Sequence, residues 1–255
     1  MAPIRWLLVH ELHDSGARWL AAQWCQRLGP HAAELLLLPA PALALCSRWQ
    51  VRVQSGGTHS RLQVTLGDGA TARHHDIDSA QLLGVLHRSC GPWVAAAAAD
   101  HDYVVQERHA LLLTWLHGLG ARCLNAPRAD ALDGPAWSAA QWRWEAQRCG
   151  MPVAPWPDPA GTPPPLLRML VAGQRSFAVN GPALDGAWHQ AARRLAATAG
   201  CGLLGLYLAP WGAGTWRFAQ ASVQADPRAG GSAAADALAD AMAMPPARQP
   251  VEVAA

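Results

Sequence analysis

Residues 203–226 read LLGLYLAPWGAGTWRFAQASVQAD, and this stretch decides how the fold closes. Its two apolar runs, Leu203–Leu208 and Trp216–Ala221, flank a turn that contains Gly212 and Gly214. Short apolar runs on either side of a glycine turn are typical of a β-hairpin. The stretch therefore predicts two antiparallel strands near the end of the chain.

The residues on both sides of this hairpin extend the pattern. Leu166–Val171 and Ser176–Val179 flank Gly173 and predict an earlier hairpin. Between the hairpins, Ala187–Ala199 carries apolar residues at helical spacing. A hairpin–helix–hairpin order, followed by a final helix over Ala233–Ala243, predicts a C-terminal α/β layer.

The start of the chain has a different order. Ile4–Val9 is a short apolar run that predicts a first strand, and Glu34–Leu38 predicts a second. Between them, Ala17–Leu28 has helical periodicity, with Asp14 or Ser15 as the expected cap. A strand–helix–strand opening is the usual start of a parallel sheet, so we expect an N-terminal parallel or mixed sheet.

The middle of the chain divides into further elements and two domains. Six prolines fall within residues 154–165, which predicts a linker or rigid loop. The expected domains are 1–122 and 123–245, with that linker inside the second and a flexible tail over 246–255. The further elements are a hairpin over 49–53 and 61–66, a buried strand over Leu82–Leu86, helices over Tyr103–Leu119 and Ser138–Cys149, and a short strand over Arg122–Asn125.

Composition narrows the class of protein. The chain has 255 residues, of which 51% are hydrophobic, and a formal net charge of +2. These values predict a soluble α/β protein of the cytoplasm, without a signal peptide, a membrane span or a nucleic-acid partner. All 20 basic residues are arginine. The six cysteines are expected to be buried free thiols: Cys25, Cys46, Cys90, Cys123, Cys149 and Cys201.

Three segments give the chain a resemblance to a known family. Asp78–Arg88 reads DSAQLLGVLHR, Tyr103–Pro155 contains Leu-Asn-x-Pro and Gly-x-Pro-Val, and Leu167–Asp226 has the closing order described above. Together they resemble the ATP-grasp superfamily, especially its peptide-modifying and carboxylate–amine ligases. The resemblance implies an α/β fold with an N-terminal pre-ATP-grasp-like α/β domain and a truncated ATP-grasp-like α+β domain.

The chain also departs from that family where the chemistry is done. The family makes an acyl-phosphate from ATP, and its Asp, Glu and Asn magnesium ligands match Tyr207, Gln220 and Ser222 here. An expected lysine falls near Ala136 and Trp137. The family's second lysine and glycine-rich lid belong to an interval that is only a dozen residues long here. The resemblance therefore implies an incomplete nucleotide cleft.

These departures leave three hypotheses open. The first is a degenerate ATP-grasp protein without ligase activity or cofactor, which acts as a binding or accessory subunit with a protein partner or as a homo-oligomer. The second is an active ATP-dependent carboxylate–amine ligase that uses ATP and magnesium. Its phosphate-binding candidates are Arg168, Arg175, Arg193 and Arg217, and its metal-binding candidates are Gln220, Ser222 and Asp226. The third is a small-molecule binder that uses the N-terminal layer alone.

Other polar clusters are weaker candidates. His10 and His13, with Glu11 and Asp14, follow the first strand, where open α/β sheets bind ligands, but a solvated loop is the favoured interpretation. The neighbouring His74 and His75 are expected on opposite faces of a strand. Trp142 and Trp144 lie about 200° apart on a helix, so one of them is expected at the surface or in an interface.

Overall fold

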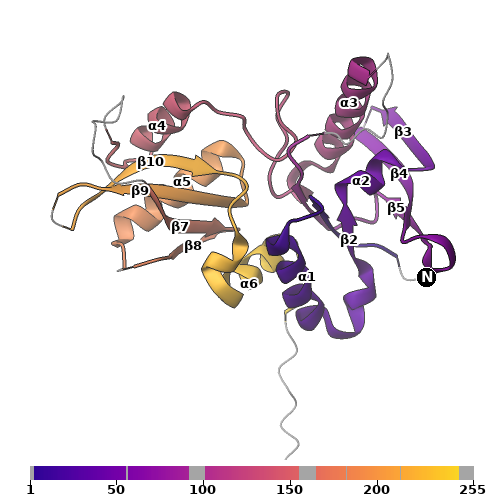
Figure 1. The fold of residues 1–255 in the computed structure, drawn as a ribbon, viewed down its shortest axis with the longest axis horizontal. Coiled ribbons are helices and arrows are strands. Elements are labelled where there is room, and N and C mark those ends of the chain that lie inside the picture. Colours follow the sequence, from indigo (N-terminus) through magenta and orange to yellow (C-terminus); the bar gives the residue numbers. More distant parts are fainter. Residues whose placement is uncertain are drawn as a thin grey trace, which may run out of the picture.

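A computed structural model describes residues 3–55, 57–91, 101–154, 165–181, 183–212 and 214–246. The described chain forms two lobes, with the early sequence in one and most of the late sequence in the other (Figure 1). Apart from Ala154, Pro165 and Pro246, the predicted linker over 154–165 and the tail over 246–255 lie outside the described residues. Within the described ranges, no helix combines the length and apolarity needed to cross a bilayer.

The N-terminal lobe is built on a parallel sheet, as the opening pattern predicts. β1 (Trp6–His10) lies between β2 (Leu35–Pro39) and β6 (Gly84–Arg88) in the order β2-β1-β6. All five residues of β1 are buried, which suits a central strand covered on both faces. Helix α1 (Ser15–Leu28) begins at the cap Asp14, whose carboxylate accepts the Ala17 amide at 2.8 Å.

A second, antiparallel sheet extends this lobe. It has the order β3-β4-β5, in which β3 and β4 are the predicted hairpin. Leu62 and Val64 face inward and join the core formed with α2 and α3. The indoles of Trp49 and Trp115 meet edge to face, with ring centroids 5.6 Å apart. The elements are α2 (Ala40–Ala44), β3 (Arg48–Gln54), β4 (Gly57–Leu66), β5 (Arg73–Asp78) and α3 (His101–Leu119).

The C-terminal lobe contains the two predicted hairpins in one antiparallel sheet of order β10-β9-β7-β8. Leu204, Leu206 and Phe218 on one face pack with α4 and α5, while α6 lies against the other face along β7 and β8. The elements are α4 (Ala139–Arg148), β7 (Leu166–Ala172), β8 (Arg175–Ala178), α5 (Gly186–Ala199), β9 (Leu203–Pro210), β10 (Trp216–Ser222) and α6 (Gly231–Ala241). The short 3₁₀ turns are η1 (Gly29–Glu34), η2 (Gly69–Thr71), η3 (Gly120–Arg122) and η4 (Pro227–Gly230).

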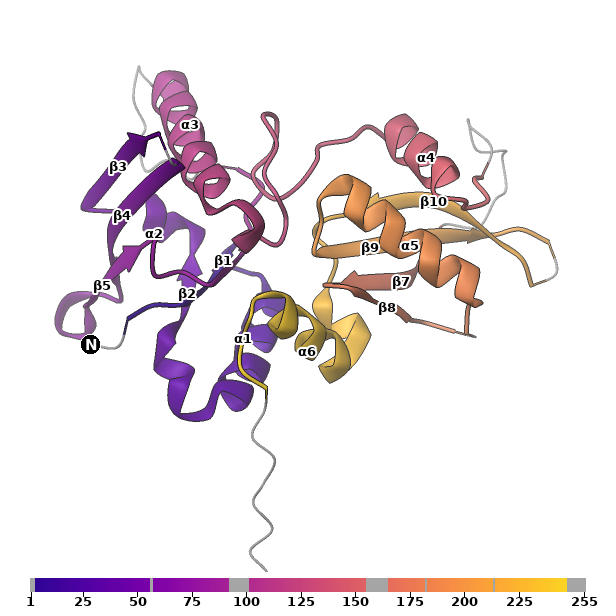
Figure 2. The ribbon, with the colours of Figure 1, turned by 180° about the vertical axis from the view of Figure 1, so that it is seen from behind.

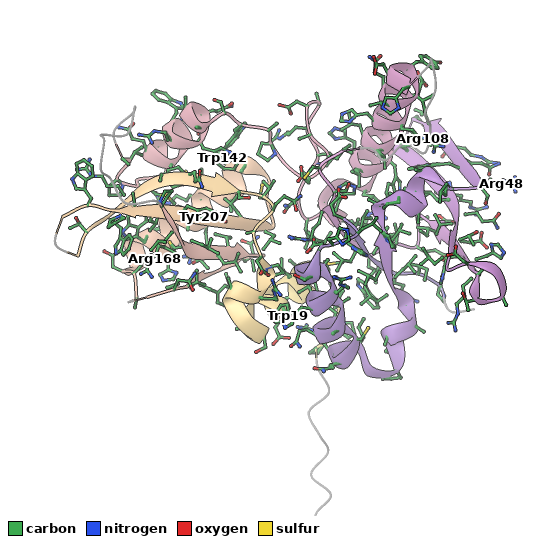
Figure 3. All side chains as sticks on the ribbon, in the orientation of Figure 1. Trp19, Arg48, Arg108, Trp142, Arg168 and Tyr207 are labelled. Carbon is green, nitrogen blue, oxygen red and sulfur yellow. The ribbon has the colours of Figure 1, made fainter. Side chains whose placement is uncertain are left out.

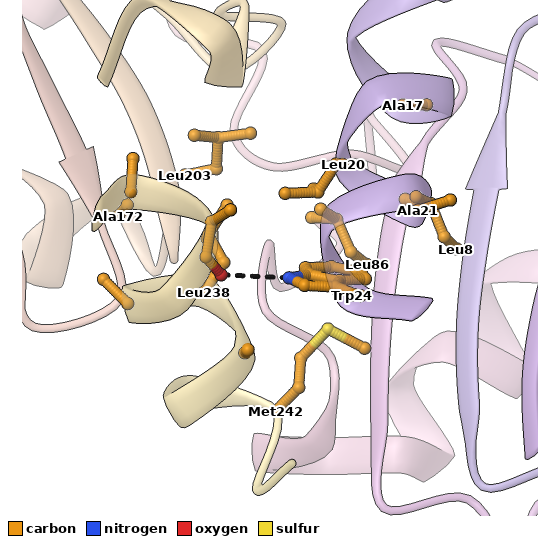
Figure 4. Packing of buried hydrophobic residues seen from close by; sticks show 14 of the residues in the cluster. Leu8, Ala17, Leu20, Ala21, Trp24, Leu86, Ala172, Leu203, Leu238 and Met242 are labelled. Atoms are coloured by element: carbon orange, nitrogen blue, oxygen red, sulfur yellow. Dashed lines mark hydrogen bonds between the residues drawn. The ribbon is translucent and has the colours of Figure 1, made fainter. Parts of the chain in front are cut away.

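Helices from the two ends of the chain join the lobes. Figures 1 and 2 both show α6 beside α1. Leu20 and Trp24 of α1 share a buried core with Leu238 of α6 (Figure 4). The Trp24 indole also donates to the Ala235 carbonyl at 2.9 Å. This core crosses the predicted domain boundary after residue 122, and that boundary stays a prediction.

Three local predictions are corrected by the structure. Arg122–Asn125 is no strand, because only isolated bridges form at Cys123 and Asn125. The strand expected over Leu82–Leu86 begins two residues later. The expected burial of all six cysteines holds for three of them and is wrong for the others, because Cys25 and Cys90 are exposed and Cys46 is half-buried.

The prediction for the α4 tryptophans is confirmed. Trp142 is 6% exposed and packs against the C-terminal sheet, whereas Trp144 is 62% exposed. Trp137, near which the resemblance implied a lysine, meets Trp142 edge to face, with ring centroids 4.7 Å apart. An aromatic pair therefore stands where the resemblance implied a positive charge.

Candidate functional site

One face of the C-terminal sheet carries the three residues that the sequence resemblance matched to the family's metal ligands. Tyr207 on β9 lies directly opposite Gln220 on β10, and Ser222 lies opposite Gly205. Directly paired residues project to the same side of a sheet, so the three side chains share one face. Figure 3 shows Tyr207 in the middle of this sheet. We call these three residues the neutral trio, because a phenol, an amide and a hydroxyl carry no charge.

A β-bulge keeps the neutral trio on the face opposite α4 and α5. The register of β10 shifts between Phe218 and Gln220. Phe218 is fully buried against α4 and α5, while Gln220 on the other side of the bulge is exposed. A bulge adds one residue to a strand and re-aims the side chains beyond it. In a regular strand without a bulge, Gln220 would lie on the same buried face as Phe218, two positions away.

The chain after β10 folds back over the same face. A Cβ atom on Gly205 would lie 2.7 Å from the Cβ of Ala225, so only glycine allows this crossing. The Ser222 hydroxyl accepts the Gln224 amide at 3.2 Å and stabilises the turn. Ser222 therefore shapes the backbone that follows β10.

Asp226, the third expected metal ligand, is engaged by other partners. Its carboxylate caps η4 and accepts hydrogen bonds from Arg228, the shortest at 2.6 Å. A Cβ atom on Gly16 of α1 would lie 3.0 Å from an Asp226 oxygen. The structure thus brings Gln220 and Ser222 together on the sheet and places Asp226 where the two lobes meet.

Two of the four candidate arginines stack on tryptophans. Arg168 is fully buried, donates to the carbonyls of Val179 and Asn180, and lies 4.6 Å from the ring centroid of Trp216. Arg217 lies 4.0 Å from the ring centroid of Trp211. Both contacts fit cation–π geometry. The burial of Arg168 among backbone carbonyls argues against a phosphate-binding role for it.

The other two arginines lie near β8, on opposite sides of it. Arg175 is within 3.6 Å of Asp240 on α6. Arg193 on α5 donates to the Ser176 hydroxyl at 3.2 Å. Successive residues of a strand project to opposite faces, which explains the separation. The structure does not gather the four candidate arginines into one cluster.

The carboxyl ends of β1 and β6 form a second polar centre, which we call the Arg88 junction. Arg88 is 4% exposed, and its Nε donates to Asp14 at 2.7 Å. Its guanidinium also donates to the Ala225 carbonyl at 3.1 Å, which links the N-terminal sheet to the segment after β10. Burial acts to raise the pKa of the Asp14 carboxyl, but hydrogen bonds and charge from Arg88 outweigh it and hold that pKa below its ordinary value.

Neighbouring groups extend the Arg88 junction. The Ser89 hydroxyl donates to Glu11 at 2.6 Å. Gln224 donates to the buried Asp133 carboxylate. Burial raises the pKa of Asp133 even though the Gln224 hydrogen bond acts to lower it. In the Arg88 junction, each of three carboxylates, on Asp14, Glu11 and Asp133, therefore accepts a hydrogen bond from a neighbouring side chain.

The expectation of a solvated loop after the first strand is only partly correct. His13 is exposed, but His10 is 4% exposed and Asp14 is held by Arg88. Among the residues that the structure describes, no group of three or more His, Cys, Asp or Glu side chains is arranged to hold a metal ion. The His74 ring pairs with Thr65 on the outer face of β5, while His75 lies on the inner face, as strand alternation predicts.

The sequence offered only a partial signal for the Arg88 junction. Arg88 ends one of the three segments that carry the family resemblance, but nothing local identifies Asp133 or Gln224 as its neighbours. Arg88 and Ala225 are 137 positions apart, and Gln224 and Asp133 are 91 apart. Contacts between residues so far apart in the sequence depend on the tertiary fold, and the periodicity of a short segment does not predict them.

Comparison with known proteins places the fold. No protein-family model and no curated protein matches the sequence. Among solved structures, macrocyclase MdnB from Microcystis aeruginosa MRC aligns with a TM-score of 0.67 and 14% identity, over 92% of this chain and 99% of that one. ATP-grasp ligase PsnB, complexed with a precursor variant, Mg and ADP, aligns with a TM-score of 0.65 and 14% identity, over 95% and 98%.

A third structure agrees. The RiPP-associated ATP-grasp ligase of Chryseobacterium gregarium, in complex with ADP and a leader and core peptide, gives a TM-score of 0.67 at 10% identity, over 97% of this chain and 99% of that one. The chain therefore has the fold of the ATP-grasp ligases, as its sequence resemblance implied.

Proposed function

We propose that this chain with the ATP-grasp fold is a binding or accessory subunit of a peptide-modification pathway and does not form an acyl-phosphate. The observation that carries the proposal is the neutral trio: Tyr207, Gln220 and Ser222 share one sheet face, and the resemblance matches these positions to the family's metal ligands. Magnesium binds hard oxygen ligands, chiefly carboxylates. An ion placed on these three groups would lose hydration without gaining a charged partner.

The positive charges that could bind a triphosphate also lie in separate places. Catalysis of phosphoryl transfer depends on cations placed around the transferred group. The sequence contains no lysine, and the four candidate arginines contact tryptophans, backbone carbonyls, Ser176 and Asp240 in separate places. These contacts support a chain that uses the fold without its chemistry.

The kind of ligand is suggested by the proteins of similar fold. PsnB is described in complex with precursor peptide PsnA2, and MdnC, at 10% identity and a TM-score of 0.61, with precursor peptide MdnA. We carry the ligand class over to this chain as part of the proposal: a peptide, with no cofactor required. The active ligase that uses arginines and needs ATP and magnesium is the competing function.

Restoring the carboxylates tests the proposal. The variant Tyr207→Asp with Gln220→Glu and Ser222→Asn places the family's ligand types on the neutral trio. We expect no magnesium-dependent ATP hydrolysis above that of the native protein, because the phosphate-binding cations are still dispersed. Phosphate release is the measurement, and thermal unfolding by circular dichroism verifies that the variant folds.

A gain of about tenfold or more in ATP turnover, which corresponds to about 1.4 kcal/mol of barrier, would contradict the proposal. It would mean that the rest of a nucleotide site is intact in this chain and that only the metal ligands differ.

A further inference from the structure

The outer face of the β3-β4-β5 sheet carries a row of polar side chains that the proposed function does not use. Strand alternation places Arg48, Gln50 and Arg52 of β3 on this face, while Trp49 and Val51 lie on the inner face. Arg48, Gln50 and Arg52 pair in register with Gln63, Arg61 and His59 of β4. We call this surface the β3 face.

Only some of the positive side chains on the β3 face have a carboxylate partner. Asp78 of β5 accepts from Arg61 at 2.9 Å and from His59 at 2.7 Å. Burial acts to raise the pKa of Asp78, but hydrogen bonds from the Ala80 amide, His59 and Arg61 outweigh it and hold that pKa below its ordinary value. In the part of the chain that the structure describes, neither Arg48 nor Arg52 has a carboxylate within ion-pair distance. The excess of positive charge therefore lies on β3.

The same face is hollowed. A cavity of about 450 Å³ opens on it, which is within the usual range for ligand sites. Arginines of β3 and β4 contribute hydrogen-bond donors to the hollow, and aspartates of β5 contribute acceptors. It is lined by Arg48, Gln50, Arg61, Leu62, Gln63, Asp76, Ile77, Asp78 and Gln81.

β3 is also the free edge of its sheet. Among the described residues it pairs with β4 alone, so the amides and carbonyls of its other side are available to another strand. Val53 at its end is 78% exposed, and Leu45 just before it is 68% exposed. Charged side chains on an edge strand discourage aggregation, but that role requires neither a hollow nor exposed apolar side chains.

We propose that the β3 face docks an acidic peptide in extended conformation, added as a strand along the free edge of β3. This rests on the proposed function and specifies its ligand. Arg48 and Arg52 are four residues apart, or roughly 13 Å along the strand, so they match carboxylates at positions i and i+4 of the peptide. Strand addition supplies main-chain hydrogen bonds, and the alternate side chains supply specificity.

The composition of the β3 face favours a peptide over a nucleic acid. Asp76 and Asp78 line the same hollow as Arg48 and would repel a phosphate backbone. Acidic side chains of a peptide can reach Arg48 and Arg52 at the edge while its backbone stays clear of both aspartates.

Charge reversal at the edge tests the docking. The probe is a short fluorescein-labelled peptide of alternating threonine and glutamate, and the readout is fluorescence anisotropy with the full chain. The variant is Arg48→Glu with Arg52→Glu. Its matched control is Arg18→Glu with Arg194→Glu, which gives the same change in charge on exposed helix positions of α1 and α5.

We expect the β3 variant to lose about tenfold or more in affinity and the control to stay near the native value. A peptide of alternating proline and glutamate, which lacks half the amide donors, should bind more weakly than the threonine peptide. Equal loss in both variants, no saturable binding of the threonine peptide, or tighter binding of a single-stranded oligonucleotide would overturn the docking proposal. None of these results bears on ATP turnover, so failure here is distinguishable from failure of the proposed function.

Discussion

At the residue scale, one buried arginine ties the two lobes together. Arg88 ends β6, pairs with the cap of α1 through Asp14, and reaches the Ala225 carbonyl in the other lobe. The sequence placed Arg88 at the end of a segment that carries the family resemblance, two residues beyond the expected strand, whereas in the structure Arg88 is the last residue of β6. The partners could not be foreseen, because ion pairs between distant segments leave no local pattern. The three positions of the neutral trio came from the family resemblance alone, and the structure adds that their side chains share a face, because directly paired strand residues do so.

Removal of the Arg88 charge should lower the free energy of unfolding. In Arg88→Met the Asp14 carboxylate loses its partner in a nearly buried position, which typically costs about 3–5 kcal/mol. Urea unfolding followed by tryptophan fluorescence measures the loss. The double variant Arg88→Met with Asp14→Asn should recover part of it, because the unpaired charge is gone while the Asn side chain still caps α1. A double variant no more stable than the single would contradict this account.

At the scale of elements, the sequence predicted the helices and hairpins well, but it did not predict the bulge or the segments that connect the elements. The hairpins that form β7–β8 and β9–β10 follow from apolar runs around glycine, and both are confirmed. The bulge in β10 has no comparable signal. Arg122–Asn125 resembled a strand, but Asn125 instead binds the backbone of Leu203 through its side chain at 2.9 Å and 3.3 Å. Side chain to backbone bonds of this kind compete with strand pairing.

The crossing at Gly205 gives a prediction at this scale. In Gly205→Ala the new methyl would meet Ala225 at 2.7 Å and Leu167 at 3.0 Å, so the segment after β10 must shift. Overpacking of this kind typically costs about 1–3 kcal/mol. Gly186→Ala is the matched control, because nothing lies within 4 Å of its Cβ position at the start of α5. Thermal unfolding should show a lower midpoint for the first variant and an unchanged or higher midpoint for the second; equal midpoints would contradict the crossing.

At the scale of the whole molecule, the fold and the chemistry of the site point in different directions. The fold is that of the ATP-grasp ligases, and the motifs in the sequence were sufficient to indicate it. The core between α1 and α6 was not predicted. The sequence of each helix indicates an apolar face, but it does not indicate which element packs against that face. We propose that the side chains on the sheet face lack the charges that magnesium and a triphosphate require.

Titration calorimetry of the native protein with ATP, in the presence and absence of magnesium, tests that claim most directly. We expect no saturable binding with a dissociation constant below about 1 mM under either condition, because neither the neutral trio nor the dispersed arginines provide a site for magnesium and triphosphate. A dissociation constant of about 10 μM or lower that requires magnesium would contradict the proposed function and favour the competing ligase.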